Sequence, residues 1–178
     1  MSTAWLALVA LPVALACGDD SRATATISPA DTADQVLLGM QHYVTQDGVQ
    51  RARVRADTAY FYSPSQSADL HGVHITFYNV AGAETSTLTA RQGTYHWRTG
   101  DMEAHGNVVV VTTDGRTLRT EALKYNQVKS EVTSDVPFVF DGPNRHIQGE
   151  GFTSDPDFKN VVARHPTGTG GKFTLPNQ

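Results

Sequence analysis

The chain has 178 residues, of which 39% are apolar and 18% are charged, and its formal net charge is −4. This composition is typical of one globular domain that can form a core, and it excludes a disordered or collagen-like chain. The single cysteine excludes an internal disulfide scaffold and a cysteine-based zinc site. The acidic balance, without a long basic run, argues against nucleic acid as a partner.

An apolar run near the N-terminus, residues 5–16, differs from everything after it. It is shorter than the about 20 residues that a membrane-spanning helix needs, and it has the character of a secretory signal. The small Ala16 directly precedes Cys17, an order that resembles the lipobox of bacterial lipoproteins, in which the cysteine becomes lipid-modified. We therefore expect a lipoprotein signal peptide in residues 1–17 with lipid attachment at Cys17. A plain signal peptide that is cut elsewhere is the alternative.

The chain after Cys17 divides into three parts by composition. Residues 18–34, rich in Ser, Thr, Ala and Asp, have no apolar period and are expected to form a flexible tether. Residues 35–165 carry short β-type patterns, and residues 166–178, with several glycines, are expected to be a disordered tail. A lipid on Cys17 would hold this exported chain to a membrane.

Residues 35–165 alternate between apolar and polar side chains in short segments, and no stretch keeps a helical period over three turns. In residues 50–62, for example, the even positions are expected to face inward, through to Tyr60 and Tyr62. Turn signals such as Asp114-Gly115 separate the segments. The pattern predicts an all-β protein with about a dozen short strands that share one apolar face.

A set of segments within this region has a recognisable order and spacing. The segments are residues 55–60, 88–95, 106–110, 118–125, 133–137 and 149–152. Together they resemble the periplasmic domain of the LptC family and of the related LptA proteins, and the resemblance extends over residues 36–162. It implies an open β-jellyroll, in which two antiparallel sheets enclose an apolar groove, and a role in lipopolysaccharide transport.

The inward stripe supplies the side chains that would line such a groove. They are Leu88, Tyr95, Trp97, Val108, Val110, Leu118, Tyr125, Phe138, Phe140, Ile147 and Phe152. Each acyl methylene exposed to water costs about 0.8 kcal/mol, so a dozen-carbon chain carried bare would cost on the order of 10 kcal/mol. The same side chains could instead fill a closed core, and the sequence does not separate the two interpretations.

The resemblance also implies partners and a location. The partners would be lipopolysaccharide, an inner-membrane ABC transporter of the LptB/LptF/LptG type and an LptA-like bridge protein, with the chain anchored to the inner membrane in the periplasm. The open ends of a jellyroll accept strands from neighbours. Residues 35–49 would then face the transporter, and residues 151–162 the bridge. The alternative is a periplasmic or surface β-sandwich with a closed core, used for adhesion or carbohydrate binding.

Catalytic and cofactor patterns are weak in this sequence. His71 and His74 fall on opposite faces of one segment and cannot share a metal ion without a bulge. The sequence has neither a nucleophile elbow nor a phosphate loop. We therefore expect no enzymatic activity, metal or cofactor. The alternating Arg51, Arg53 and Arg55 form a row that either meets phosphorylated lipid headgroups or an acidic partner surface, or is a solvated edge.

Overall fold

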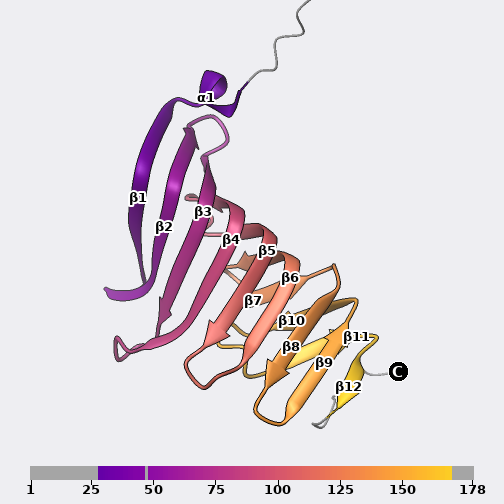
Figure 1. Ribbon diagram of the computed structural model, residues 1–178. Coiled ribbons are helices and arrows are strands. Elements are labelled where there is room, and N and C mark those ends of the chain that lie inside the picture. The colour runs from indigo at the N-terminus through magenta and orange to yellow at the C-terminus, as the bar shows by residue number, and fades with distance from the viewer. Residues whose placement is uncertain (1–27, 47, 170–178) are drawn as a thin grey trace, which may run out of the picture.

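The computed structural model describes residues 28–46 and 48–169, and strands dominate this part of the chain (Figure 1). A short helix, α1 (Pro29–Thr32), precedes them. The strands are β1 (Gln35–Gln46), β2 (Val49–Tyr62), β3 (Ser67–Tyr78), β4 (Glu84–His96), β5 (Met102–Thr112), β6 (Thr117–Asn126), β7 (Glu131–Ser134), β8 (Phe138–Gly142), β9 (Arg145–Gly149), β10 (Gly151–Ser154), β11 (Val161–Arg164) and β12 (Thr167–Thr169). The described residues include no helix long and apolar enough to cross a membrane. The predicted all-β class is confirmed.

The strands form one antiparallel sheet that folds into two layers. Its order runs from β1 to β6, after which the sheet divides, because the two halves of β6 have different partners. Residues 117–120 pair with β8, which leads to β9 and β12, while residues 124–126 pair with β7, which leads to β10 and β11. Figure 1 shows β1 at one end of the stack and β11 and β12 at the other. This is the predicted open jellyroll, with free strand edges at both ends.

The long strands bend from one layer to the other along a line that we call the corner. At the corner β1, β3 and β5 carry Gly39, Gly72 and Gly106, whose φ angles are +62°, +65° and +76°. Glycine adopts such angles without the steric cost that a Cβ atom brings. The register of β5 against both β4 and β6 also shifts at this level. The glycines therefore allow each of these strands to enter both layers.

Charged side chains from the intervening strands lie over two of these glycines. A Cβ atom on Gly72 would overlap the Asp57 carboxyl of β2, and one on Gly106 would lie 3.2 Å from Cβ of Arg91 on β4. The space that the glycines leave empty is thus used by the neighbouring strand. Substitution at the corner would disturb the packing as well as the backbone angle.

The corner also changes which positions face inward. In β2 the buried side chains pass from an even position, Ala56, to an odd one, Ala59. Tyr60 and Tyr62, which we expected on the inner face, therefore lie on the outer face, and Phe61 packs against the core instead. A strict two-residue alternation fails at a bend because the irregular backbone shifts the alternation by one position.

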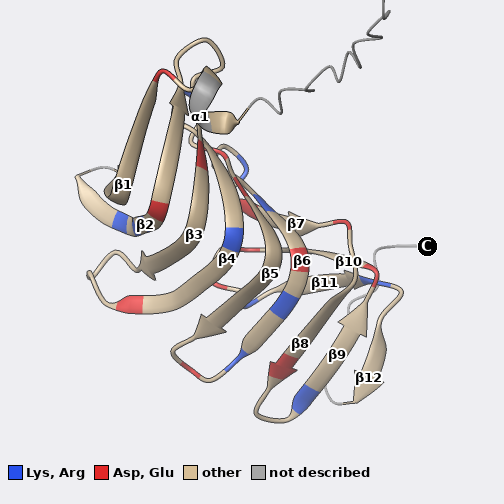
Figure 2. Ribbon diagram, turned by 45° about the horizontal axis from the view of Figure 1, so that its top comes forward, with Lys and Arg blue, Asp and Glu red and all other residues tan. Residues whose placement is uncertain are grey.

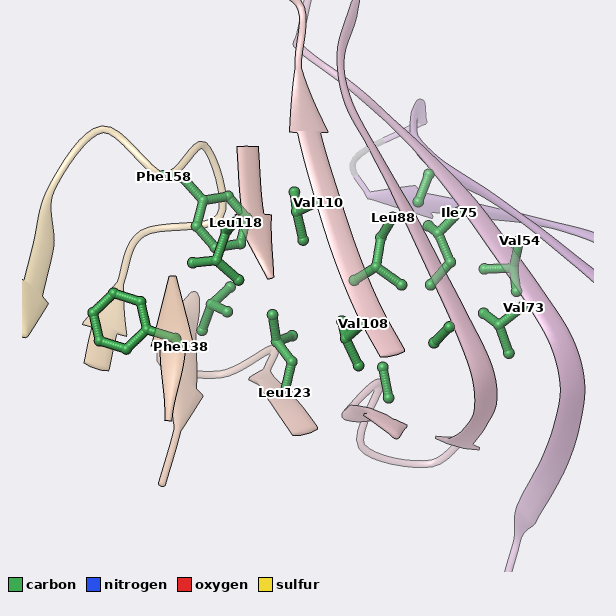
Figure 3. Close-up of a cluster of buried hydrophobic side chains, with 14 of the residues drawn as sticks. Val54, Val73, Ile75, Leu88, Val108, Val110, Leu118, Leu123, Phe138 and Phe158 are labelled. Carbon is green, nitrogen blue, oxygen red and sulfur yellow. The ribbon is translucent and has the colours of Figure 1, made fainter. Parts of the chain in front are cut away.

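The inner faces of the layers meet in a shared apolar core (Figure 3). Its buried side chains include Val54, Val73, Ile75, Leu88, Val108, Val110, Leu118, Leu123, Phe138, Phe140, Ile147 and Phe152. The rings of Phe138 and Phe152 meet edge to face, with their centroids 5.0 Å apart. Because these rings come from β8 and β10, they join the two branches of the divided sheet.

Short elements occur in both segments that were expected to lack structure. The helix α1 lies within residues 18–34, where the Asp34 carboxylate accepts a 2.6 Å hydrogen bond from the Ser63 backbone N–H. Strand β12 lies within residues 166–178 and pairs with β9, which corrects the expected disorder for its residues. Contacts with β9 and with the end of β2, distant in sequence, order these elements. The expected signal peptide, Cys17 and residues 170–178 lie outside the described residues.

Gly72 at the corner and Gly82 in an exposed turn have similar φ angles, but substitution by alanine should lower the free energy of unfolding more at Gly72. Gly82→Ala, in an exposed turn with nothing near its Cβ position, should lower the free energy of unfolding by about 1 kcal/mol, the cost of the left-handed backbone. Gly72→Ala should lower it by about 2 kcal/mol or more, because overlap with Asp57 adds to that cost. Urea unfolding measures both values, and equal losses would contradict the packing at the corner.

Candidate functional site

The space between the layers is the candidate site, because the predicted groove side chains gather there. Those buried in it are Leu88, Val108, Val110, Leu118, Phe138, Phe140, Ile147 and Phe152. Tyr95 and Tyr125 are partly buried and pack against the same core. Trp97 differs, since it lies just beyond the end of β4 and is 40% exposed. The structure thus brings together every predicted lining residue except Trp97, which lies at the margin.

The space between the layers is almost filled by these side chains. A cavity among the described side chains there has a volume of about 30 Å³. Its lining comes from both layers and consists of Ile75, Phe77, Leu88, Met102, Glu103, Ala104, Leu123, Tyr125, Val132, Pro156 and Phe158. A volume of this size suffices for about one water molecule and not for a fatty acyl chain. In this structure the middle of the candidate site is therefore closed.

Phe158 is a lining residue that the sequence analysis missed. It lies in the loop between β10 and β11 and is only 3% exposed, and the centroid of its ring lies 6.4 Å from that of Phe152. Figure 3 shows it entering the core at the end where Leu118 and Phe138 lie. A strand alternation could not reveal it, because it stands outside the strands between the charged Asp157 and Lys159.

Arg116 ties this loop to the opposite layer. It lies in the turn between β5 and β6, and its side chain is 13% exposed. Nη1 donates a hydrogen bond to the carbonyl of Phe158, and Nη2 donates one of 3.3 Å to the carbonyl of Asp157. One guanidinium group therefore connects a turn of one layer with a loop of the other. We call this set of contacts the Arg116 bridge.

The carboxylate of Asp114 orients the Arg116 guanidinium. It accepts a 2.8 Å hydrogen bond from Nε, which leaves both terminal nitrogens directed toward the loop carbonyls. Hydrogen bonds from Arg116 and from the Thr112 hydroxyl lower the pKa of Asp114 to about 2. The carboxylate therefore keeps its charge, and its hold on Arg116, at every pH near neutrality.

A wider cleft opens at the β1 end of the layers, with a volume of about 400 Å³. Aromatic groups such as Tyr95 and Trp97 border it together with polar ones, and its lining consists of His42, Tyr43, Val44, Thr45, Tyr95, Trp97, Arg98, Thr99, Gly100 and Gln127. The ring centroids of His42 and Tyr95 lie 5.8 Å apart, and those of Phe61 and Trp97 lie 6.1 Å apart. Burial raises the pKa of Tyr95, so its hydroxyl stays neutral. The cleft is the part of the site with room for a ligand.

The arginine row lies on β2, and its Arg53 and Arg55 are on the outer face, away from this interior. Its positions alternate with buried ones such as Val54, and Arg53 donates a hydrogen bond of 3.5 Å to the Thr76 hydroxyl of β3. The pKa of His74, on the same face, is lowered by burial and then by the charges of Arg55 and Arg53. Arg53 and Arg55 therefore belong to the outer surface, whereas the charge of Arg51 acts on Tyr125 beside the interior cavity.

Charged residues of both signs are spread over the strands (Figure 2). A separate hollow of about 500 Å³ lies on the outer side of the corner, where β6 divides, and polar groups such as Arg119 and Glu121 border it. There the His165 ring lies 2.7 Å from the Glu150 carboxylate, with both side chains exposed to solvent. Across residues 28–46 and 48–169, no group of His, Cys, Asp or Glu could hold a metal ion. The interior remains the feature that best fits a ligand.

Because Phe140 is buried and Trp97 is largely exposed, we expect their substitution to lower the free energy of unfolding by very different amounts. Phe140→Ala should lower the free energy of unfolding by about 3–5 kcal/mol, because the ring is 2% exposed and leaves a cavity. Trp97→Ala, at the exposed margin, should lower it by about 1 kcal/mol or less. Urea unfolding of both variants tests this expectation. A comparable loss at Trp97 would mean that it belongs to the core.

Comparison with known proteins adds to this geometry. The fold is similar to that of the crystal structure of LptH from Pseudomonas aeruginosa, described as the LptA-homologous periplasmic component of the conserved lipopolysaccharide transport device. The TM-score is 0.52, the alignment covers 71% of this chain and 89% of that one, and the 18% identity supports the fold alone. No curated protein matches the chain. The family model for LptC-related lipopolysaccharide-assembly proteins matches residues 5–162, so the chain belongs to the LptC-related family.

Proposed function

We propose that this protein is a lipid-anchored periplasmic component of the lipopolysaccharide transport bridge and shelters acyl chains between its two layers. The family assembles lipopolysaccharide and is not a family of enzymes. The observation that carries the proposal is an apolar interior, shared by both layers, in a sheet whose edges are free at both ends. Such a carrier stabilises its cargo by burial and forms no covalent bond with it.

The energetic argument rests on the acyl chains of the cargo. Transfer of each methylene from water to an apolar lining contributes about 0.8 kcal/mol. The cavity of about 30 Å³ cannot hold such a chain, so loading requires interior side chains to move apart. The wider cleft at the β1 end, bounded by Tyr95 and Trp97, is the proposed entry. Its neutral Tyr95 hydroxyl costs less to desolvate beside an acyl chain than a charged group would.

The sheet edges are the proposed docking sites for protein partners. Strand β1 has a free edge and exposes apolar side chains, among them Val36, Leu38 and Tyr43, which are 41%, 81% and 49% exposed. A free edge presents unpaired backbone groups that a neighbouring strand can pair with. We assign the β1 edge to an ABC transporter of the LptB/LptF/LptG type, and the β11 and β12 edges to an LptA-like bridge protein.

The proposed lipid on Cys17 agrees with this orientation. The described chain enters the fold directly before β1, so an N-terminal anchor and the β1 edge share one end of the molecule (Figure 1). An anchor in the inner membrane would bring this edge toward a transporter in the same membrane. The β11 and β12 edges, at the other end, would then point toward the periplasm.

A second candidate function is an adhesive or carbohydrate-binding β-sandwich with a closed core. The nearly filled interior is the observation that favours it, since a packed core needs no cargo. The two candidates differ in whether lipid ever reaches the side chains between the layers. Crosslinking from those side chains distinguishes them.

Photo-crosslinking from the interior should capture lipopolysaccharide. A photoreactive phenylalanine at Tyr125, which borders the cavity between the layers, is expected to label lipopolysaccharide in cells. The matched control is Tyr60, which lies on the outer face of β2 and should give no label above background. Immunoblotting for lipopolysaccharide on the purified adduct provides the measurement. Equal labelling from both tyrosines, or none from Tyr125, would reject the interior as the acyl site.

Photo-crosslinking from the β1 edge should capture a transporter subunit. A photoreactive residue at Leu38, which is 81% exposed on the edge strand, is expected to form an adduct with an inner-membrane transporter protein. Val128, which is 88% exposed between β6 and β7, is a matched exposed valine away from either edge. Mass spectrometry of the adducts identifies the partner. The same adduct from Val128, or none from Leu38, would reject the assignment of this edge.

A further inference from the structure

The loop between β10 and β11, residues 155–160, inserts an aromatic ring between the layers. Phe158 is 3% exposed, and it borders the small interior cavity together with Pro156. Its φ angle is +53°, an uncommon and strained conformation for a bulky residue. Strained residues persist where the surrounding contacts hold them, and they concentrate at ligand-binding and switching segments.

Polar contacts, and not strand pairing, hold this loop in place. The Asp155 carboxylate accepts hydrogen bonds of 2.9 Å and 3.0 Å from the backbone N–H groups of Lys159 and Asn160. These bonds shape the loop from within. The link to the other layer is the Arg116 bridge, through the carbonyls of Asp157 and Phe158. Besides the apolar packing of the ring itself, the loop is thus held by polar contacts that are not part of the strand pairing.

We propose that Phe158 occupies, in the unloaded protein, the position that a fatty acyl chain takes between the layers, and that the Arg116 bridge keeps it there. This inference rests on the proposed function and names the place of the acyl chain more closely. On loading, the chain displaces the ring, and the loop swings outward. On release, the ring returns and shields the apolar lining from water.

The lining of the cavity fits an acyl chain in the place of the ring. The side chains around it are aliphatic or aromatic and come from both layers, with Ile75 and Leu88 on one side and Leu123 and Val132 on the other. Removal of the Phe158 ring would enlarge this apolar space, and an apolar cavity of about 150 Å³ is large enough to bind benzene. The place of the ring thus suits part of an acyl chain, and the rest of the chain requires further side chains to move apart.

Binding of a fluorescent fatty acid to the full chain tests the proposal. The probe is dansyl-labelled undecanoic acid, whose emission rises in an apolar site. Phe158→Ala removes the ring and Arg116→Met removes the bridge, and each should lower the probe Kd about tenfold, because a closed state no longer competes with binding. The matched control is Lys159→Ala in the same loop, whose amine donates a hydrogen bond to the Asp157 carboxylate of that loop and which should leave Kd unchanged.

The outcomes separate this proposal from the proposed function. If the unchanged protein binds the probe but Phe158→Ala and Arg116→Met bind it equally or more weakly, the ring is ordinary core packing and the acyl groove stands. If neither the unchanged protein nor any variant binds the probe, the acyl groove itself is wrong, and this proposal falls with it.

Hydrogen exchange of the unsubstituted protein provides a test that does not depend on the folding of variants. The Phe158 amide donates a 3.0 Å hydrogen bond to the Asp155 carbonyl, and the Lys159 amide donates one to the Asp155 carboxylate. Saturating probe should accelerate exchange at both amides, since the loop leaves its place. The Thr87 and Val109 amides, within strands of the opposite layer, serve as internal references. Unchanged exchange in the loop of the saturated protein would overturn the proposal.

Discussion

The structure depends on one constraint, which is that each long strand must leave one layer and enter the other without interrupting the apolar face. In alternate strands the bend passes through a left-handed backbone angle, which an L-residue with a side chain resists. Glycines at Gly39, Gly72 and Gly106 relieve this constraint in alternate strands, and Asp57 and Arg91 of the strands between them fill the vacated space. The result is a single sheet with an apolar inside and free strand edges at both ends.

An apolar interior that also serves as a binding site must be both closed to water and open to a ligand, and these two requirements conflict. Water must be kept out of the apolar lining when no ligand is present, but a permanently filled core leaves no room for one. The protein closes most of the space with its own side chains, among them Phe138 and Phe152 in edge-to-face contact. The proposed exchange of Phe158 against an acyl chain resolves this conflict, because the same apolar surface is covered in both states.

Much of the fold was predictable because alternation is a local property. The strands, the all-β class and most of the buried side chains follow from period two, and so do Leu88, Val110 and Phe140 as inward residues. The prediction failed at Tyr60 and Tyr62, because the corner shifts the alternation within one strand. It also placed Trp97 with the lining, although β4 ends one residue before it and leaves the ring at the margin.

The sequence by itself determined the class of fold, the family and the apolar stripe, because these depend on the order of residue types along the chain. The tertiary structure alone decided that the interior is almost full, that the sheet divides at β6, and that Phe158 and Arg116 meet across the layers. Arg116 and Phe158 are separated by five strands, and no local pattern relates a guanidinium in one turn to a carbonyl in a distant loop. Contacts of this kind exist only once the layers have folded together.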